Sequence, residues 1–242
     1  MSETTSTSPL TVVLVHGAFA DSSSWAGVIE RLQAKGVQVV AAANPLRGIT
    51  HDSAYVASLF AQIPGRVLAV GHSYGGAVIS NAATGAPNVV GLVFVAAFAP
   101  DEGEKLGDVT GASKDSVLGT ALVPHPYPTE SGTGTEFSID PAKARDAFAA
   151  DLSDAQATLI GVIQRPVADL AFGEPSGAPA WKTLPSWAVV ATSDRAAGTD
   201  VVRAHAERAG AQITEVDGSH VIMISQPQVV ADVIEAAIGK VG

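Results

Sequence analysis

The chain has 242 residues, of which 47% are hydrophobic and 16% charged, and its formal net charge is −10. This length and apolar content are sufficient for one large α/β domain with a substantial core. The acidic balance argues against nucleic acid and against an anionic membrane surface as partners. Because the sequence contains no cysteine, disulfides, thiolate nucleophiles and cysteine-ligated metals are excluded.

The first nine residues are rich in serine and threonine, with neither a basic segment nor an apolar stretch. They do not resemble a secretory signal, and we expect a frayed, disordered tail over residues 1–9. No apolar run of the sequence approaches the roughly 18 residues of a membrane span. We therefore expect a cytoplasmic protein that does not enter a membrane.

Short apolar runs alternate with segments of helical periodicity along most of the chain. Strands joined by helices form right-handed βαβ units, and these predict a mostly parallel central sheet flanked by helices. Ligand sites of such sheets lie beyond the carboxyl ends of the strands. The predicted strands are residues 10–15, 37–42, 66–70, 88–96, 186–192 and 211–216, and the predicted helices are 25–34, 51–63, 77–83, 199–209 and 227–238.

The alternation of predicted strands and helices is absent between residues 101 and 183. The region contains many prolines and a run rich in glycine, threonine and serine that ends at Thr135. The pattern predicts no strand here and two helices, 141–152 with Asp140 as N-cap and 154–164 with Ser153 as N-cap. We interpret 101–183 as a helical cap, inserted after the strand that ends near Ala96, over a core made of residues 10–100 and 184–242. A second small domain is the alternative.

The segment Gly71-His72-Ser73-Tyr74-Gly75 follows one predicted strand and precedes a predicted helix. A G-x-S-x-G sequence in this setting predicts a sharp turn that exposes the serine hydroxyl above the sheet. Glycines remove the Cβ atoms that would clash in such a turn. The helix N-terminus also favours developing negative charge. Ser73 is therefore the predicted nucleophile, and the alternative is a glycine-rich turn with an incidental serine.

A serine nucleophile requires a base and an acid that orients the base. His220 follows the last predicted strand and is the predicted base. Asp194 follows the strand 186–192 and is the preferred acid, with Asp101 and Asp217 as alternatives. The order serine, aspartate, histidine is typical of one large class of serine hydrolases. Of the other histidines, His16 is interpreted as structural and bonded to backbone, and His72 as too close to Ser73 to act as its base. His51, His125 and His205 are interpreted as solvated.

Backbone N–H groups next to the nucleophile would stabilise an oxyanion. The candidates are the amides of Tyr74 and Ala18, with Phe19 as a secondary candidate. The sequence has no zinc-binding H-E-x-x-H motif and no G-x-G-x-x-G loop, so we expect neither a metal nor another cofactor.

The sequence resembles the α/β-hydrolase superfamily, and is most similar to small bacterial esterases related to plant methylesterases and hydroxynitrile lyases. The residues that carry the resemblance are Val13–Ala18, Trp25, Gly71–Gly76, Phe94–Pro100, Asp194-Arg195 and Ser219-His220. The resemblance spans residues 10–240 and implies an α/β-hydrolase fold with Ser73, His220 and Asp194 as the catalytic triad. The plant lyases carry a threonine in the oxyanion loop and a lysine after the catalytic histidine. This chain has Gly17 or Ala18 and Val221 at those places, which disfavours cyanohydrin cleavage.

These observations predict a serine hydrolase that cleaves carboxylic esters of small, largely apolar substrates through an acyl-enzyme. A hydroxynitrile lyase, a perhydrolase and a non-catalytic small-molecule receptor are the alternatives. The sequence leaves the oligomeric state open, a homodimer included. Five aromatic residues in and near the cap suggest an apolar pocket, although core packing would explain them equally well: Phe98, Phe137, Phe148, Phe172 and Trp181.

Overall fold

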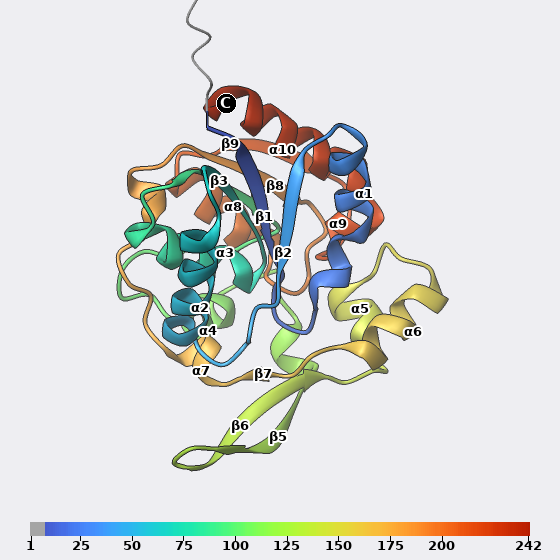
Figure 1. Ribbon diagram of the computed structural model, residues 1–242. Helices are drawn as coiled ribbons and strands as arrows, with labels where there is room; N and C mark the ends of the chain where they lie inside the picture. Colours follow the sequence, from blue (N-terminus) through green and yellow to red (C-terminus); the bar gives the residue numbers. More distant parts are fainter. Residues whose placement is uncertain (1–7) are drawn as a thin grey trace, which may run out of the picture.

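Six strands, most of them apolar runs, form the central sheet of the computed structural model, which describes residues 8–242 (Figure 1). Every neighbouring pair of strands in this sheet is parallel, and the order is β2-β1-β3-β4-β8-β9. The predicted mostly parallel sheet is confirmed. Its strands are β1 (Leu10–Val15), β2 (Gln38–Ala42), β3 (Arg66–His72), β4 (Val89–Val95), β8 (Ser186–Ala191) and β9 (Gln212–Val216).

Helices cover both faces of the sheet (Figure 1). Right-handed crossovers from β1 to β2 and from β8 to β9 run in opposite directions along the sheet, so their helices lie on opposite faces. One face carries α1 (Ala26–Ala34), preceded by η1 (Ser22–Trp25), and α10 (Pro227–Val241), preceded by α9 (Ile222–Ser225). The other face carries α2 (Ile49–Gln62), α3 (Tyr74–Ala82) with η2 (Ala83–Gly85), and α8 (Thr199–Arg208).

The region 101–183 contains a β-hairpin, so the prediction of no strand there is wrong. Strands β5 (Leu122–Thr129) and β6 (Gly132–Ile139) are antiparallel, and β7 (Val167–Ala168) pairs with the far side of β6. Three prolines, at 124, 126 and 128, misled the prediction. They occupy alternate positions of the edge strand β5, so the N–H groups that they lack belong to one side, and the intervening residues remain able to pair with β6.

The two predicted helices of this region fare differently. Helix α6 (Asp154–Ile163) begins after Ser153, whose side chain and that of Gln156 form a reciprocal capping box, as the sequence predicts. The predicted helix 141–152 is wrong in extent. Asp140 instead accepts hydrogen bonds in a turn, and α5 (Ala144–Phe148) is one short helix. The other elements of the region are α4 (Leu106–Gly111), η3 (Leu118–Thr120), α7 (Leu170–Gly173) and η4 (Ala180–Lys182).

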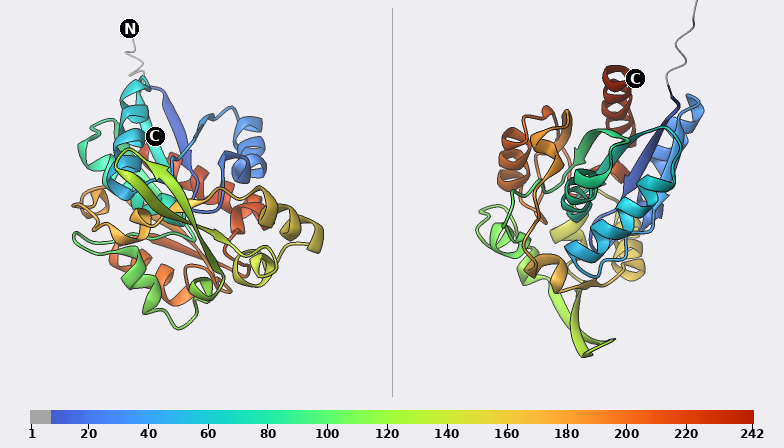
Figure 2. Two further views of the ribbon diagram at one scale, coloured as in Figure 1. Left: turned by 90° about the horizontal axis from the view of Figure 1, so that it is seen from below. Right: turned by 60° about the vertical axis from the view of Figure 1, so that its left-hand side comes forward.

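The hairpin projects from the body of the molecule, at the end where the strands of the main sheet finish (Figures 1 and 2). At its base, Arg47 pairs with Glu136 at 2.7 Å and lies over the ring of Tyr127. The Ala168 N–H donates to the Leu46 carbonyl at 2.9 Å. These contacts join the hairpin to the loop after β2.

At the opposite end, the Pro9 carbonyl accepts a hydrogen bond of 2.8 Å from the Arg66 N–H. The rest of the predicted tail, residues 1–7, lies outside the described residues. Within residues 8–242, no helix combines the length and the apolar character that a membrane crossing requires.

Candidate active site

Ser73 lies in the turn between β3 and α3 with φ of 53° and ψ of −123°. A non-glycine residue in this region of backbone space is strained. The turn holds it because the Ser73 carbonyl accepts from the N–H groups of Gly76 at 3.0 Å and Phe98 at 3.2 Å. A Cβ on Gly75 would come within 2.4 Å of the Val15 carbonyl oxygen, and one on Gly17 within 2.6 Å of Ser73 Cβ. Only glycine fits at these two positions, so the loop after β1 and the serine turn pack directly together.

Asp194 and His220 form a buried pair. His220 Nδ1 lies 2.7 Å from Asp194 Oδ2, and both side chains are almost fully buried. The other carboxylate oxygen accepts from the N–H groups of Ala196 at 2.9 Å and Ala197 at 3.0 Å. The Asp194 N–H donates to Thr199 Oγ1 at 3.0 Å. A carboxylate held in this way accepts a hydrogen bond from Nδ1–H of His220 and so favours the tautomer that carries its proton on Nδ1. The other ring nitrogen, Nε2, is then free to accept a proton.

The two rival acids lie elsewhere. Asp101 pairs with Lys182 at 2.5 Å. Asp217 is exposed and accepts from the hydroxyls of Thr192 and Ser193. Of the three carboxylates that the sequence left open, Asp194 is the one bonded to His220.

The ring of His220 lies between two other rings. Its centroid is 4.7 Å from that of His72, which precedes Ser73, and 5.0 Å from that of Phe148. His72 Nε2 donates to the His220 carbonyl at 2.9 Å. The β3–α3 turn and the loop after β9 are therefore fastened to each other. Within residues 8–242, the Ser73 hydroxyl makes no hydrogen bond, so the structure joins His220 to Asp194 and not to Ser73. The hydrogen bond between a nucleophile and its base is often long before substrate binds, so this geometry still permits Ser73 as the nucleophile.

Two backbone N–H groups beside Ser73 have no acceptor. Tyr74 is the first residue of α3 and Ala18 follows β1, and both residues are buried. Neither N–H donates to any group in the described part of the chain. Buried N–H groups without a partner are rare in folded proteins. They are the two amides from which the sequence predicts an oxyanion hole. Phe19, the secondary candidate, has φ of 60°, and its N–H likewise donates to no group in the described part of the chain.

His16 and His72 are buried and uncharged. His16 Nδ1 donates to the Gly17 carbonyl at 2.9 Å, the structural role expected from the sequence. Burial lowers the pKa of His16 to about 4, and burial, followed by the neighbouring His220, holds the pKa of His72 well below its ordinary value. The prediction that His205 is solvated is wrong, because this residue of α8 is buried and accepts from the Ala99 N–H at 3.0 Å. Burial lowers the pKa of His205 to about 4.

Asp52 is a residue of the site that the sequence analysis missed. It is fully buried on α2 and accepts from the Tyr74 hydroxyl at 2.8 Å and from the Arg47 N–H at 3.1 Å. Burial raises the pKa of Asp52, and burial with the Asp52 charge raises that of Tyr74 well above its ordinary value. The bond fixes the side chain of the residue that follows the nucleophile. The available signal was Tyr74 itself, because a buried tyrosine hydroxyl needs a partner.

Aromatic side chains separate two cavities near these loops. Phe19 packs edge-on against Phe148 and is stacked on Phe172, with centroid distances of 6.2 and 6.5 Å. Phe148 lines a cavity of about 230 Å³, and Phe172 and Phe137 line another of about 350 Å³. The remaining two of the five aromatic residues, Phe98 and Trp181, are buried and line neither cavity.

Comparison with known proteins gives a family and a fold. Residues 12–233 match the model of the alpha/beta hydrolase family. No curated protein sequence matches the chain. The fold is similar to the crystal structure of polyneuridine aldehyde esterase, with a TM-score of 0.79 at 21% identity over 95% of this chain and 99% of that one.

Two further solved structures have the same fold. A methylesterase, MES16, from Arabidopsis has a TM-score of 0.78 at 18% identity, over 95% of this chain and 99% of its own. The pyrethroid hydrolase PytH has a TM-score of 0.76 at 20% identity, over 94% and 97% of the two chains.

Proposed function

The chain belongs to the alpha/beta hydrolase family, and from this premise we propose that it hydrolyses carboxylic esters of small, largely apolar substrates. The observation that carries the proposal is the buried Asp194–His220 pair, packed on His72 directly before a strained Ser73, with unpartnered amides at Tyr74 and Ala18. The esterase names of two proteins with the same fold also support ester hydrolysis.

In the proposed mechanism, His220 Nε2 accepts the proton of Ser73 as Oγ attacks the ester carbonyl. Asp194 accepts a hydrogen bond from Nδ1–H of His220, which stays protonated, and stabilises the imidazolium that forms. The carbonyl oxygen becomes an oxyanion that accepts from the Ala18 and Tyr74 N–H groups. His220 then gives its proton to the departing alcohol, and an acyl-enzyme remains on Ser73. Water, deprotonated by His220, releases the acid.

The competing activities differ in what they need beside the triad. The residue after His220 is Val221, which is buried and carries no charge. The lyase alternative therefore lacks the cation that the plant enzymes place there. A receptor that does not catalyse would have no use for a histidine held with Nε2 as an acceptor.

A fluorophosphonate probe and a small ester panel test the proposal. We expect the probe to label the wild type at Ser73 and to leave Ser73→Ala unlabelled. Hydrolysis of p-nitrophenyl acetate should be lost in the same variant. Folded wild-type protein that resists labelling would refute the proposal. Rapid cyanide release from mandelonitrile with negligible ester turnover would instead identify a lyase.

A further inference from the structure

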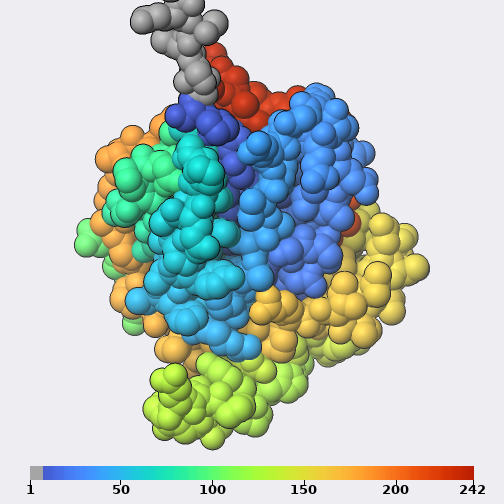
Figure 3. Space-filling model, viewed as in Figure 1, coloured from blue at the N-terminus to red at the C-terminus, as the bar shows by residue number. Residues whose placement is uncertain are grey.

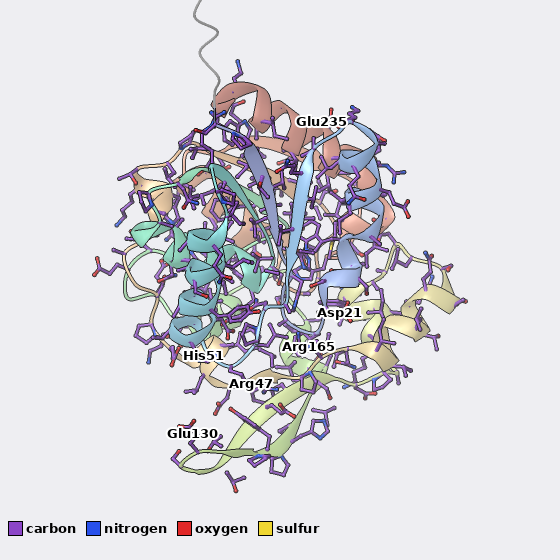
Figure 4. All side chains as sticks on the ribbon, in the orientation of Figure 1. Asp21, Arg47, His51, Glu130, Arg165 and Glu235 are labelled. Atoms are coloured by element: carbon purple, nitrogen blue, oxygen red, sulfur yellow. The ribbon has the colours of Figure 1, made fainter. Side chains whose placement is uncertain are left out.

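The cavity of about 230 Å³ lies between η1 and α1 of the core and α6 of the inserted region. In Figure 3, residues of α6, in yellow, border those of η1 and α1, in blue, and Figure 4 labels Asp21 where η1 approaches α5 and α6. Leu159 and Ile163 lie at its outer side and are 57% and 48% exposed. The cavity is therefore open to solvent along the exposed side of α6.

The lining of this cavity is mainly apolar. Phe19, Phe148, Ile160 and Met223 form much of it, and few polar side chains reach it. An apolar cavity of roughly 150 Å³ is sufficient to bind benzene. A cavity of about 230 Å³ can therefore hold an aromatic ring or a short alkyl chain.

The position of the cavity relative to His220 indicates which part of an ester it would hold. Phe148 has one ring that both lines the cavity and lies 5.0 Å from the His220 ring. Val221, the next residue after His220, lines it as well. In ester cleavage the histidine gives its proton to the departing alcohol, so the alcohol leaves on the histidine side while the acyl group stays on the serine.

We propose that the cavity between η1–α1 and α6 is the binding site for an apolar alcohol portion of the ester, an aryl-methyl or short alkyl group. This inference rests on the proposed ester hydrolysis and makes it more specific.

Two substrate series separate the two portions. Acetates of methanol, butanol, hexanol and benzyl alcohol vary the alcohol, whose acidity changes little, while the acyl group stays constant. Esters of p-nitrophenol from acetate to octanoate vary the acyl group alone. For the wild type we expect kcat/KM to rise at least about tenfold from methyl to benzyl acetate, as burial of several apolar carbons predicts.

Two variants change the size of the cavity in opposite directions. Ala26 lines the cavity and is exposed, so Ala26→Phe fills it without entering the core. It should remove the preference for the large alcohols and leave the ratios within the acyl series as they were. Ile160→Ala enlarges the cavity and should move the preference toward hexyl and benzyl acetate. Ala155→Phe is the matched control, since Ala155 is exposed on α6 and does not line the cavity, and it should change neither series.

Results other than these would contradict either the cavity assignment or the proposed ester hydrolysis, and the two cases can be told apart. If Ala26→Phe alters the acyl series and not the alcohol series, the cavity holds the acyl portion and the proposal is overturned. If active Ala26→Phe and Ile160→Ala variants keep both wild-type series, the cavity is not a substrate site. If the wild type turns over no ester faster than Ser73→Ala, the proposed function has failed and this inference falls with it. Circular dichroism and thermal melting of each variant identify loss of folding.

Discussion

The loops that carry Ser73, Asp194 and His220 differ from the inserted β5–β6 hairpin in burial and in the contacts that hold them. Ser73, Asp194 and His220 are buried and held by backbone hydrogen bonds from several strands and helices. The inserted hairpin is exposed mainly toward its tip, and it is joined to the core at its base by the Arg47–Glu136 ion pair and by packing of Ile139 and Phe137. The candidate reacting groups thus belong to the buried part of the fold, whereas the surfaces that would select a substrate lie partly on the inserted segment. Substitutions in the first region should therefore have much larger effects.

The largest effect is expected for Asp194→Asn. The Ala196 and Ala197 N–H groups can still bond to the amide oxygen, so its NH₂ group faces His220 and the imidazole proton moves to Nε2, where the base is needed. We expect kcat for p-nitrophenyl acetate to fall about 10⁴-fold with little change in folding. Asp101→Asn and Asp217→Asn are the matched controls and should keep wild-type rates. A near-normal rate in Asp194→Asn with a large loss in either control would assign the acid elsewhere.

Acidification should destabilise the buried core by several kcal/mol. Burial holds the pKa of His16 and His205 at about 4 and that of His72 lower than usual, whereas an unfolded histidine titrates near 6.5. The unfolded state therefore binds more protons between these values, and stability falls as the pH drops from about 6.5 toward 4. His16 and His205 should each cost on the order of 2–3 kcal/mol by pH 4.5. Asp52, whose pKa is raised by burial, acts in the opposite direction.

Urea unfolding at a series of pH values measures this loss. His205→Gln should flatten the dependence, because glutamine offers an acceptor to Ala99 without titrating. His51→Gln, at an exposed histidine of α2, should leave the slope unchanged. Equal slopes in the wild type and His205→Gln would contradict the assignment of this loss to His205.

Tyr74→Phe tests whether the Asp52 bond supports the structure or the chemistry. The variant keeps the backbone N–H of residue 74 and removes a donor from a fully buried carboxylate. We expect the free energy of unfolding to fall by about 1–3 kcal/mol and kcat/KM to change less than about tenfold. Tyr55→Phe, at a 44% exposed tyrosine of α2, is the control. A hundredfold loss of activity at unchanged stability would mean that the hydroxyl takes part in the reaction.

The smallest effect is expected in the hairpin. Glu136→Gln removes the charge that pairs with Arg47, and partly exposed ion pairs contribute about 0–1 kcal/mol. Stability should change by no more than that, and turnover of p-nitrophenyl acetate should stay within about twofold. Glu130→Gln, at the tip of the hairpin (Figure 4), is the matched control. If Glu136→Gln lowered the free energy of unfolding as much as Tyr74→Phe does, the hairpin would be as sensitive to substitution as the buried site.

The regions also differ in how much of them could be predicted. The main sheet has continuous apolar runs bounded by glycine or proline, and β1 was predicted to the residue. The capping box at Ser153 is local, so the start of α6 was predictable too. The shortness of α5 was not, because the Phe148 carbonyl and the Asp151 carboxylate both accept from the Ser219 hydroxyl, a partner that is distant in sequence.

In the site, the order of the loops along one sheet edge pointed to the three side chains, and the Asp194–His220 contact agrees with that expectation. The roles of Ser73, His220, Asp194 and the amides of Ala18, Tyr74 and Phe19 remain predictions until the experiments above are done. The Asp52–Tyr74 bond could not be derived, since nothing local to α2 indicates that its first turn approaches the residue after Ser73. The cavity beside α6 likewise exists only when α6 and η1 meet.

The alternate prolines of β5 have a consequence for the behaviour of the protein in concentrated solution. An exposed strand edge can recruit a strand from a neighbouring molecule, and ladders of this kind lead to aggregates. Pro124, Pro126 and Pro128 offer no hydrogen-bond donor along the outer side of β5. The hairpin can therefore extend into solvent beside the candidate active site without acting as a template for intermolecular sheets.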